Sequence, residues 1–222
     1  MNFPIHALER LYNEHACSEY AQWSKKYMRN QFDFLGIRTP IRRKLTKQFL
    51  KENGIPSKEE LQTVILTLWE KPEREYQKAA LDILEKTKKT LTPADMPWLV
   101  SLLKSKSWWD TIDVLSPHIF GYMFLQYPEL VSLYPDQWID DDYIWLQRSA
   151  ILYQLYYKEN MNEKLLYDYI LRQALSDEFF VQKAIGWVLR EYAKTNASSV
   201  QLFVSQNQLK PLSKREALKH LS

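Results

Sequence analysis

Cysteine and long apolar runs are scarce in this sequence. Cys17 is the only cysteine among 222 residues, so no internal disulfide can form. The histidines, at positions 6, 15, 118 and 220, have no metal-ligand spacing with Cys17, so no metal is expected. No segment approaches the roughly 20 apolar residues of a membrane span, and the N-terminus lacks a basic region followed by an apolar run. We therefore expect a reduced, cytoplasmic protein with no membrane association.

Signals for β-structure are also sparse. The chain has four glycines, its β-branched residues are outnumbered by Leu, Lys, Glu, Gln and Ala, and no alternating pattern occurs. With 45% hydrophobic and 26% charged residues, it is long enough to bury a substantial core. Prolines recur before or within apolar-periodic segments, which is typical of short helices joined by tight turns. We expect an all-α protein forming one domain over residues 1–222.

The apolar periodicity predicts where these helices lie. The expected helices are 4–15, 18–33, 40–52, 57–70, 73–88, 94–104, 108–125, 128–134, 142–157, 161–175, 177–194, 197–206 and 213–221.

Three of the expected helices share a short pattern. Gln77, Gln147 and Gln182 each follow an apolar residue and precede a basic residue and a small one. The last two are 35 residues apart and the first two 70, twice that interval. A helical period of this length predicts an α-solenoid of HEAT-like repeats, whose equivalent helices line a concave binding groove.

Two adjacent tryptophans and two aspartates lie near the middle of the chain. If this segment is helical, Ser107 is its N-cap and Asp110 stands in capping-box position. Trp108 then faces the core, whereas Trp109 and Asp113 share another face, four residues apart. Folding alone leaves Asp113 unexplained. The alternative is that Asp113 pairs with a lysine and Trp109 is half-buried packing.

Arg148 lies on or beside an apolar helix face and aligns in the repeat with Lys78 and Lys183. An unpaired arginine there would be costly, so a carboxylate or a phosphate partner is expected. The alternative is an internal salt bridge between adjacent repeats.

The expected helix over residues 177–194 has two distinct faces. Its apolar stripe consists of Val181, Ile185, Val188 and Tyr192. The neighbouring face is basic with one tryptophan and carries Lys183, Trp187, Arg190 and Lys194. An indole among cations fits a sugar-phosphate backbone, with the ring on deoxyribose and the cations on phosphates. The alternative is a tryptophan packed under lysine stems.

Charge is unevenly distributed although the formal net charge is only +3. Basic residues, Arg43 among them, clearly outnumber acidic ones up to residue 50, and aspartates gather between positions 136 and 142. This separation predicts a positive surface suited to nucleic acid, although basic residues also dot the helices of ordinary proteins.

Four motifs together resemble the bacterial DNA alkylation repair family, the AlkD-type alkylpurine DNA glycosylases. They are SWWDTID at 107–113, IWLQRSAI at 144–151, QKAIGWVLREYAK at 182–194 and LSKREALK at 212–219. The resemblance extends over essentially the whole chain, including Lys26–Met28 and the segment around Gly36. It implies HEAT-like repeats around duplex DNA, with excision of cationic N-alkylated purines such as 3-methyladenine, 7-methylguanine and bulkier adducts.

The resemblance also assigns roles to individual residues. Asp113 matches the family's catalytic aspartate, Trp109 and Trp187 match tryptophans flanking the lesion's sugar, Arg148 matches a residue gripping the backbone, and Tyr27 matches a tyrosine near the duplex. No cofactor, a monomer and excision without conventional base flipping are expected. From their charge we add DNA contacts at Lys183, Arg190, Lys194 and Arg43. The main alternative is a non-catalytic helical-repeat protein that binds damaged DNA or a protein partner; a metal-dependent hydrolase has less support.

Overall fold

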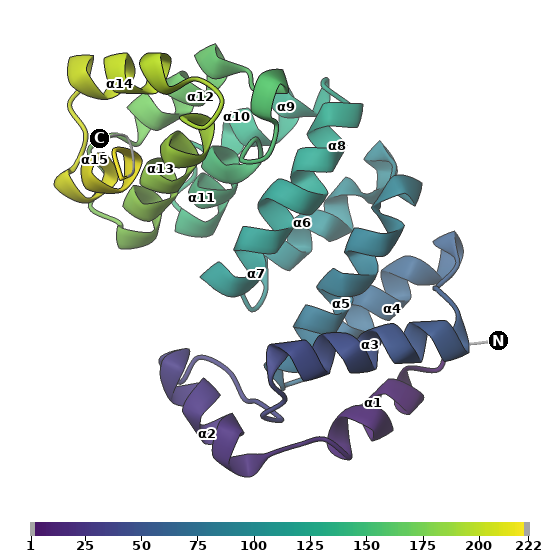
Figure 1. Cartoon of the computed structure of the whole chain (residues 1–222). Helices are drawn as coiled ribbons and strands as arrows, with labels where there is room; N and C mark the ends of the chain where they lie inside the picture. The colour runs from purple at the N-terminus through teal and green to yellow at the C-terminus, as the bar shows by residue number, and fades with distance from the viewer. Residues whose placement is uncertain (1–2, 220–222) are drawn as a thin grey trace. The chain divides into compact units, whose positions relative to one another are not determined.

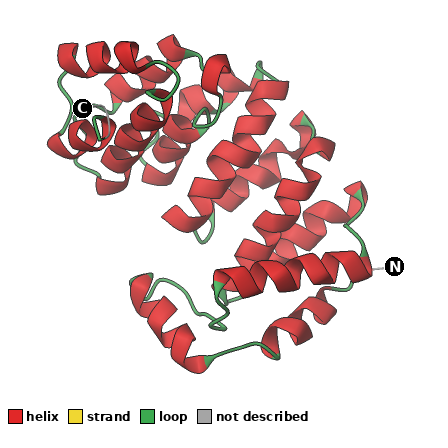
Figure 2. Ribbon diagram, viewed as in Figure 1, coloured by secondary structure: helices red, strands yellow, loops and turns green. Residues whose placement is uncertain are grey.

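The computed structural model describes residues 3–219, and every regular element in that range is a helix (Figure 2). Strand-like pairing among these residues is limited to an isolated bridge between Asp33 and Glu73. The expected all-α class is therefore confirmed, and the arrangement is consistent with helical repeats. The chain packs as two compact units that meet in sequence between Leu91 and Thr92. The single domain expected from the sequence stays a prediction.

The first unit contains five α-helices and a short 3-10 turn, coloured purple to blue-green in Figure 1. These are α1 (Ile5–Asn13), α2 (Ser18–Tyr27), α3 (Thr39–Asn53), α4 (Lys58–Glu70), α5 (Arg74–Thr87) and η1 (Lys88–Thr90). Helix α3 packs on α1 and α5, and α4 packs on α5. Trp23 and Tyr27, on one side of α2, are 56% and 60% exposed, so this face of the helix is uncovered.

A buried carboxylate fixes the segment that leads from α2 to α3. Glu75 accepts hydrogen bonds from the backbone N–H groups of Leu35, Gly36 and Ile37 at 2.9–3.1 Å. Gly36 has a φ of +84°, and a Cβ there would meet the backbone oxygen of Cys17, so only glycine fits this close approach. The fixed segment therefore lies against the backbone at the start of α2.

The second unit contains the remaining elements, coloured teal to yellow in Figure 1. These are η2 (Pro93–Asp95), α6 (Met96–Lys104), α7 (Trp109–Val114), η3 (Leu115–Phe120), α8 (Gly121–Gln126), α9 (Leu130–Leu133), α10 (Pro135–Trp138), α11 (Ile144–Leu152), η4 (Lys158–Asn160), α12 (Glu163–Arg172), α13 (Phe179–Tyr192), α14 (Ala197–Gln206) and α15 (Pro211–Ala217). Helix α11 is central, because it packs on α6, α7, α10, α12 and α13. Helix α13 also packs closely on α15.

Most expected helices are confirmed, but several differ in extent, and α10 lies in a segment where no helix was expected. Helix α2 ends at Tyr27 instead of residue 33, because Arg29 and Asn30 adopt left-handed φ values of 55° and 58°. Helix α11 ends at Leu152, five residues early. The expected helix 108–125 includes a π-helical stretch, η3, around Pro117, which has no N–H to continue the ordinary ladder. The last expected helix, 213–221, corresponds to α15, which begins at Pro211 and ends at Ala217; the expected part beyond residue 219 lies outside the described residues.

The repeated glutamines make equivalent contacts. The Nε2 atoms of Gln77, Gln147 and Gln182 donate to backbone carbonyls of Lys71, Asp141 and Ser176 at 2.7, 2.6 and 3.0 Å. In each case the acceptor lies six residues before the glutamine, in the turn that enters the helix. The amide thus satisfies a carbonyl that the turn leaves without a partner. The repeat inferred from the sequence therefore has a structural counterpart, while its HEAT type stays a prediction. No helix among residues 3–219 has the length and apolar character needed to span a bilayer.

Candidate functional site

The start of α7 differs from the sequence-based prediction. The N-cap position is Trp108, whose backbone is extended, and no side chain caps the helix. The Ser107 hydroxyl instead donates to the Leu103 carbonyl at 2.5 Å, so the predicted capping box with Asp110 is wrong. The reason is that α6 ends just before this turn and its carbonyl attracts the hydroxyl. Asp110 is buried in the first turn of α7.

Asp113 and Arg148 form a bidentate ion pair between α7 and α11. Arg148 Nε lies 2.8 Å from Asp113 Oδ1, and Nη2 lies 3.0 Å from Oδ2. The Asp113 side chain is 20% exposed and that of Arg148 only 5%. This pair is the internal salt bridge that the sequence left as the alternative to a DNA contact by Arg148. It satisfies the requirement that an arginine on an apolar face have a partner, and it leaves the carboxylate as the outward end.

Arg148 also reaches a third helix. Its Nη1 donates to the backbone carbonyl of Phe180, in the first turn of α13. Beneath it, Trp108, Trp145 and Phe180 form an aromatic cluster with ring centroids 4.9–5.6 Å apart. Trp108 thus packs inward as predicted, although its buried Nε1 has no hydrogen-bond partner among the described residues. The guanidinium therefore joins α7, α11 and α13 at one point, and the orientation of Asp113 depends on all three helices.

Opposing effects set the protonation of Asp113. Burial raises the pKa of its carboxyl group above the ordinary aspartate value, and Arg148 lowers this pKa through its charge and its hydrogen bonds. The nearby Asp110 carboxylate adds a smaller increase to the pKa. The net direction is upward. The pair with a permanently charged guanidinium nevertheless favours the ionised form at neutral pH.

The two tryptophans assigned to the site are both half-buried. Trp109 opens α7, one helical turn before Asp113, as the sequence predicts. Trp187 lies on α13, the helix whose Phe180 carbonyl accepts from Arg148. The apolar stripe predicted for α13 is confirmed, since Val181, Ile185, Val188 and Tyr192 are all buried.

Two cations on the basic face of α13 pair with a carboxylate that the sequence did not predict. Glu216, from α15, lies 3.1 Å from Lys183 Nζ and 2.8 Å from Arg190 Nη1. The approach is possible because Gly186 has no side chain: a Cβ there would clash with Glu216 Cβ and approach the Ser213 carbonyl. A glycine inside an otherwise regular helix, one residue before Trp187, was the available signal of close packing.

The remaining predicted DNA contacts differ in their surroundings. Lys194 is exposed in the turn that follows α13 and pairs with Glu191, in the last turn of that helix, at 2.6 Å. Arg43, in the first unit, is exposed and makes no ion pair within residues 3–219; it lines an open pocket with two lysines, Lys47 and Lys86, and two acidic residues, Asp82 and Glu85. Tyr27, at the end of α2, is 60% exposed. Asp113 and Arg148 thus pair directly in the second unit, and Tyr27 and Arg43 belong to the first.

Glu216→Gln is expected to lower the free energy of unfolding at neutral pH by about 1 kcal/mol, because two partly exposed ion pairs are lost. Hydrogen bonds from Lys183 and Arg190 lower the pKa of Glu216 below its ordinary value. Its contribution is therefore complete above the unfolded pKa of about 4.3 and is lost as pH falls through the lower folded pKa.

Urea unfolding at about pH 7 and at about pH 3 checks this expectation. The matched control is Glu129→Gln, because Glu129 is exposed and has no ion pair in the described part of the chain. A destabilisation by Glu216→Gln that is equal at both pH values would show that the ion pairs contribute nothing to stability.

Within residues 3–219, no three His, Cys, Asp or Glu side chains are arranged to hold a metal ion. The groups that the site does bring together are a fixed carboxylate, an arginine and half-buried indoles. Such groups can stabilise a developing positive charge or orient a water molecule.

Comparisons with known proteins identify the family of this chain. The family model of the DNA alkylation repair enzymes matches residues 8–221. A solved structure described as a predicted DNA alkylation repair enzyme from Enterococcus faecalis superposes with a TM-score of 0.86. It is 34% identical in sequence, and the match covers 94% of this chain and 97% of that chain. No curated protein sequence matches. The family match over nearly the whole length shows that the chain belongs to the DNA alkylation repair enzyme family.

Proposed function

We propose that this protein is a DNA glycosylase that hydrolyses the N-glycosidic bond of cationic alkylated purines in duplex DNA. The substrates are 3-methyladenine, 7-methylguanine and bulkier N-alkyl adducts. The observation that carries the proposal is the Asp113 carboxylate, mostly buried and held by Arg148 on a family scaffold of DNA alkylation repair. DNA is the partner, and the protein acts as a monomer in the cytoplasm without a cofactor.

The reaction needs an ionised carboxylate near the sugar more than it needs a general acid that protonates the base. A purine alkylated on a ring nitrogen is already positively charged, so its glycosidic bond breaks without prior protonation. The positive charge then moves to the sugar in an oxocarbenium-like transition state, where a fixed anion gains attraction. Two opposite charges ~4 Å apart at an effective dielectric of ~20 interact by roughly 4 kcal/mol. That energy corresponds to about a thousandfold in rate when it arises mainly in the transition state.

The Arg148 pair shapes how Asp113 acts. Because the guanidinium is the more buried partner, the negative end of the pair faces outward. Both carboxylate oxygens are held by Arg148 nitrogens, so their remaining lone pairs point in defined directions before any substrate binds. The arginine's charge reduces the attraction to a sugar cation, which makes the Coulomb figure an upper bound. Asp113 also positions the attacking water, and this role supplies the remainder of the rate enhancement that we assign to Asp113.

The remaining assigned residues hold the DNA. Trp109 and Trp187 shape a low-dielectric wall around the lesion's sugar. The DNA backbone and duplex are contacted by Lys183, Arg190, Lys194, Arg43 and Tyr27. Lys183 is 38% exposed and Arg190 28%, so their ion pairs with Glu216 leave N–H groups available to phosphates. The lesion stays in or near the duplex, which limits excision to bases that are labile when cationic.

The decisive experiment is base release from methylated duplex DNA, with and without a chelator, by wild type and Asp113→Asn. Release by wild type that is insensitive to chelator and lost in Asp113→Asn supports the proposal. Salt-dependent DNA binding without base release would instead identify a non-catalytic protein that binds damaged DNA. Chelator-sensitive release would point to a metal-dependent hydrolase.

Trp109→Ala and Trp187→Ala are each expected to slow excision about tenfold at saturating enzyme, a loss of ~1.4 kcal/mol, because the wall around the sugar opens to water. Single-turnover release of 7-methylguanine measures this loss. Trp98→Phe is the control, since Trp98 is a buried packing tryptophan whose Nε1 donates to Asp95. Unchanged rates in both site variants would return Trp109 and Trp187 to a packing role.

A further inference from the structure

Three aromatic rings stack along the uncovered face of α2. The Tyr20 and Trp23 centroids are 5.2 Å apart with ring planes 15° from parallel, and those of Trp23 and Tyr27 are 5.3 Å apart at 6°. Trp23 is 56% exposed, unusually high for a tryptophan. The rings cover part of one another's faces, and the aromatic surface that stays exposed is of the kind on which proteins stack the bases of single strands.

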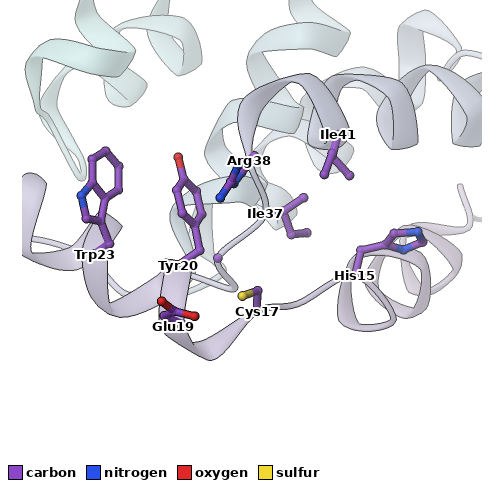
Figure 3. A pocket seen from close by; sticks show the side chains of 9 residues that line it. His15, Cys17, Glu19, Tyr20, Trp23, Ile37, Arg38 and Ile41 are labelled. Atoms are coloured by element: carbon purple, nitrogen blue, oxygen red, sulfur yellow. The ribbon is translucent and has the colours of Figure 1, made fainter.

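An open cavity of about 560 Å³ lies against this ladder. We call it the α2 pocket; its lining includes Tyr20 and Trp23 on one side and Ile37, Arg38 and Ile41 on the other. Figure 3 shows the Tyr20 and Trp23 rings extending the same way from α2, with Arg38 beside Tyr20. Its volume is typical of sites for small organic groups, roughly 300–1,000 Å³.

The charge of the α2 pocket suits an anion. The Arg38 guanidinium lies 5.2 Å from the centre of the Tyr20 ring and has no carboxylate partner in the described chain. Its N–H groups are therefore available to a phosphate. Glu19 also lines the pocket, but Figure 3 places its carboxylate at the backbone end of the Tyr20 side chain, not at the ring. Aromatic faces, apolar walls and an unpaired arginine thus converge in one cavity.

We propose that the α2 pocket binds an unpaired nucleotide of DNA, with its base against Trp23 and Tyr20 and its phosphate on Arg38. The inference rests on the proposed function, because DNA that the protein contacts at a lesion offers the pocket nucleotides that are transiently unpaired. An apolar peptide is the competing occupant. The parallel rings and the unpaired guanidinium favour the nucleotide, since a peptide would leave Arg38 without a partner.

The test measures binding of a short single-stranded oligonucleotide containing 2-aminopurine, whose fluorescence falls when it stacks on an aromatic ring. We expect quenching by wild type and about tenfold weaker binding by Trp23→Leu, with binding of a fully paired duplex changed less than about twofold. Arg38→Gln should reduce the salt slope of single-strand binding by about one unit. Tyr143→Leu is the control, because Tyr143 is 36% exposed and belongs to the second unit.

Each other outcome overturns the inference. Unchanged single-strand binding by Trp23→Leu, or equal losses for single strand and duplex, would show that the pocket does not select unpaired nucleotides. Binding of free deoxyguanosine monophosphate as tight as the oligonucleotide would make it a site for soluble nucleotides. Displacement of the strand by an apolar helical peptide but not by a second strand would make it a protein-docking surface.

Thermal unfolding verifies that the variants are folded. Base release is scored separately, so binding without release would contradict the glycosylase proposal while leaving this one standing.

Discussion

Asp113→Asn is expected to slow excision of 7-methylguanine from duplex DNA on the order of a thousandfold while leaving DNA binding nearly intact. The substitution removes the negative charge that opposes the developing sugar cation, and it weakens the ability to activate water. The amide has the same shape, and its oxygen still accepts one hydrogen bond from Arg148. The loss should therefore appear in the rate of the chemical step, measured by single-turnover base release at saturating enzyme.

Asp110→Asn is the matched control for this prediction. Asp110 is a second buried carboxylate on the same short helix, close enough to influence the pKa of Asp113. Excision by Asp110→Asn should stay within about tenfold of wild type. Excision by Asp113→Asn at the wild-type rate would remove Asp113 from the mechanism and leave its ion pair as a purely structural feature.

Arg148→Gln is expected to destabilise the protein by about 3–5 kcal/mol and to shift the acid limb of the pH–rate profile to higher pH. Stability falls because the substitution leaves Asp113 as a largely buried charge without its partner. Burial already raises the pKa of Asp113, and Arg148 provides the main lowering effect. Without the arginine the carboxylate protonates at a higher pH, so activity is lost earlier on acidification.

Two measurements check the Arg148 prediction: thermal unfolding, and single-turnover rates from about pH 4 to about pH 8. Arg172→Gln is the control, since Arg172 is 35% exposed, pairs with Asp140 and Asp168, and should contribute less than about 1 kcal/mol. A double-mutant cycle with Asp113→Asn isolates the interaction between the two residues. An unchanged pH limb together with a salt slope reduced by about one unit would mean that Arg148 contacts a phosphate directly.

The ion pairs of Lys183 and Arg190 with Glu216 change how much each basic residue should contribute to DNA affinity. From sequence, Lys183 and Arg190 are free cations, yet both share Glu216. Their attraction to phosphates is therefore offset by a carboxylate at contact distance. Arg43 has no such partner within residues 3–219, so it is expected to contribute more to the salt dependence of binding than either residue of α13.

Properties that depend on neighbours along the chain could be predicted from the sequence. Helical class, the buried stripe of α13 and the shared face of Trp109 and Asp113 follow from a periodicity of 3.6 residues. The repeat of Gln77, Gln147 and Gln182 was also visible, because each amide bonds a carbonyl only six residues away. Such interactions are determined locally and survive any arrangement of the helices.

Only the tertiary structure decided which charged groups meet. From the sequence, the partner of Arg148 could equally be a phosphate or a carboxylate. The packing of α7 on α11 places Arg148 against Asp113, 35 residues earlier in the chain. Glu216 reaches Lys183 and Arg190 because Gly186 lets α15 approach α13. Ser107 does not cap α7, because its hydroxyl donates to the Leu103 carbonyl near the end of α6. Ion pairs and caps of this kind depend on distances of a few ångströms between distant segments, and periodicity along one helix carries no information about those distances.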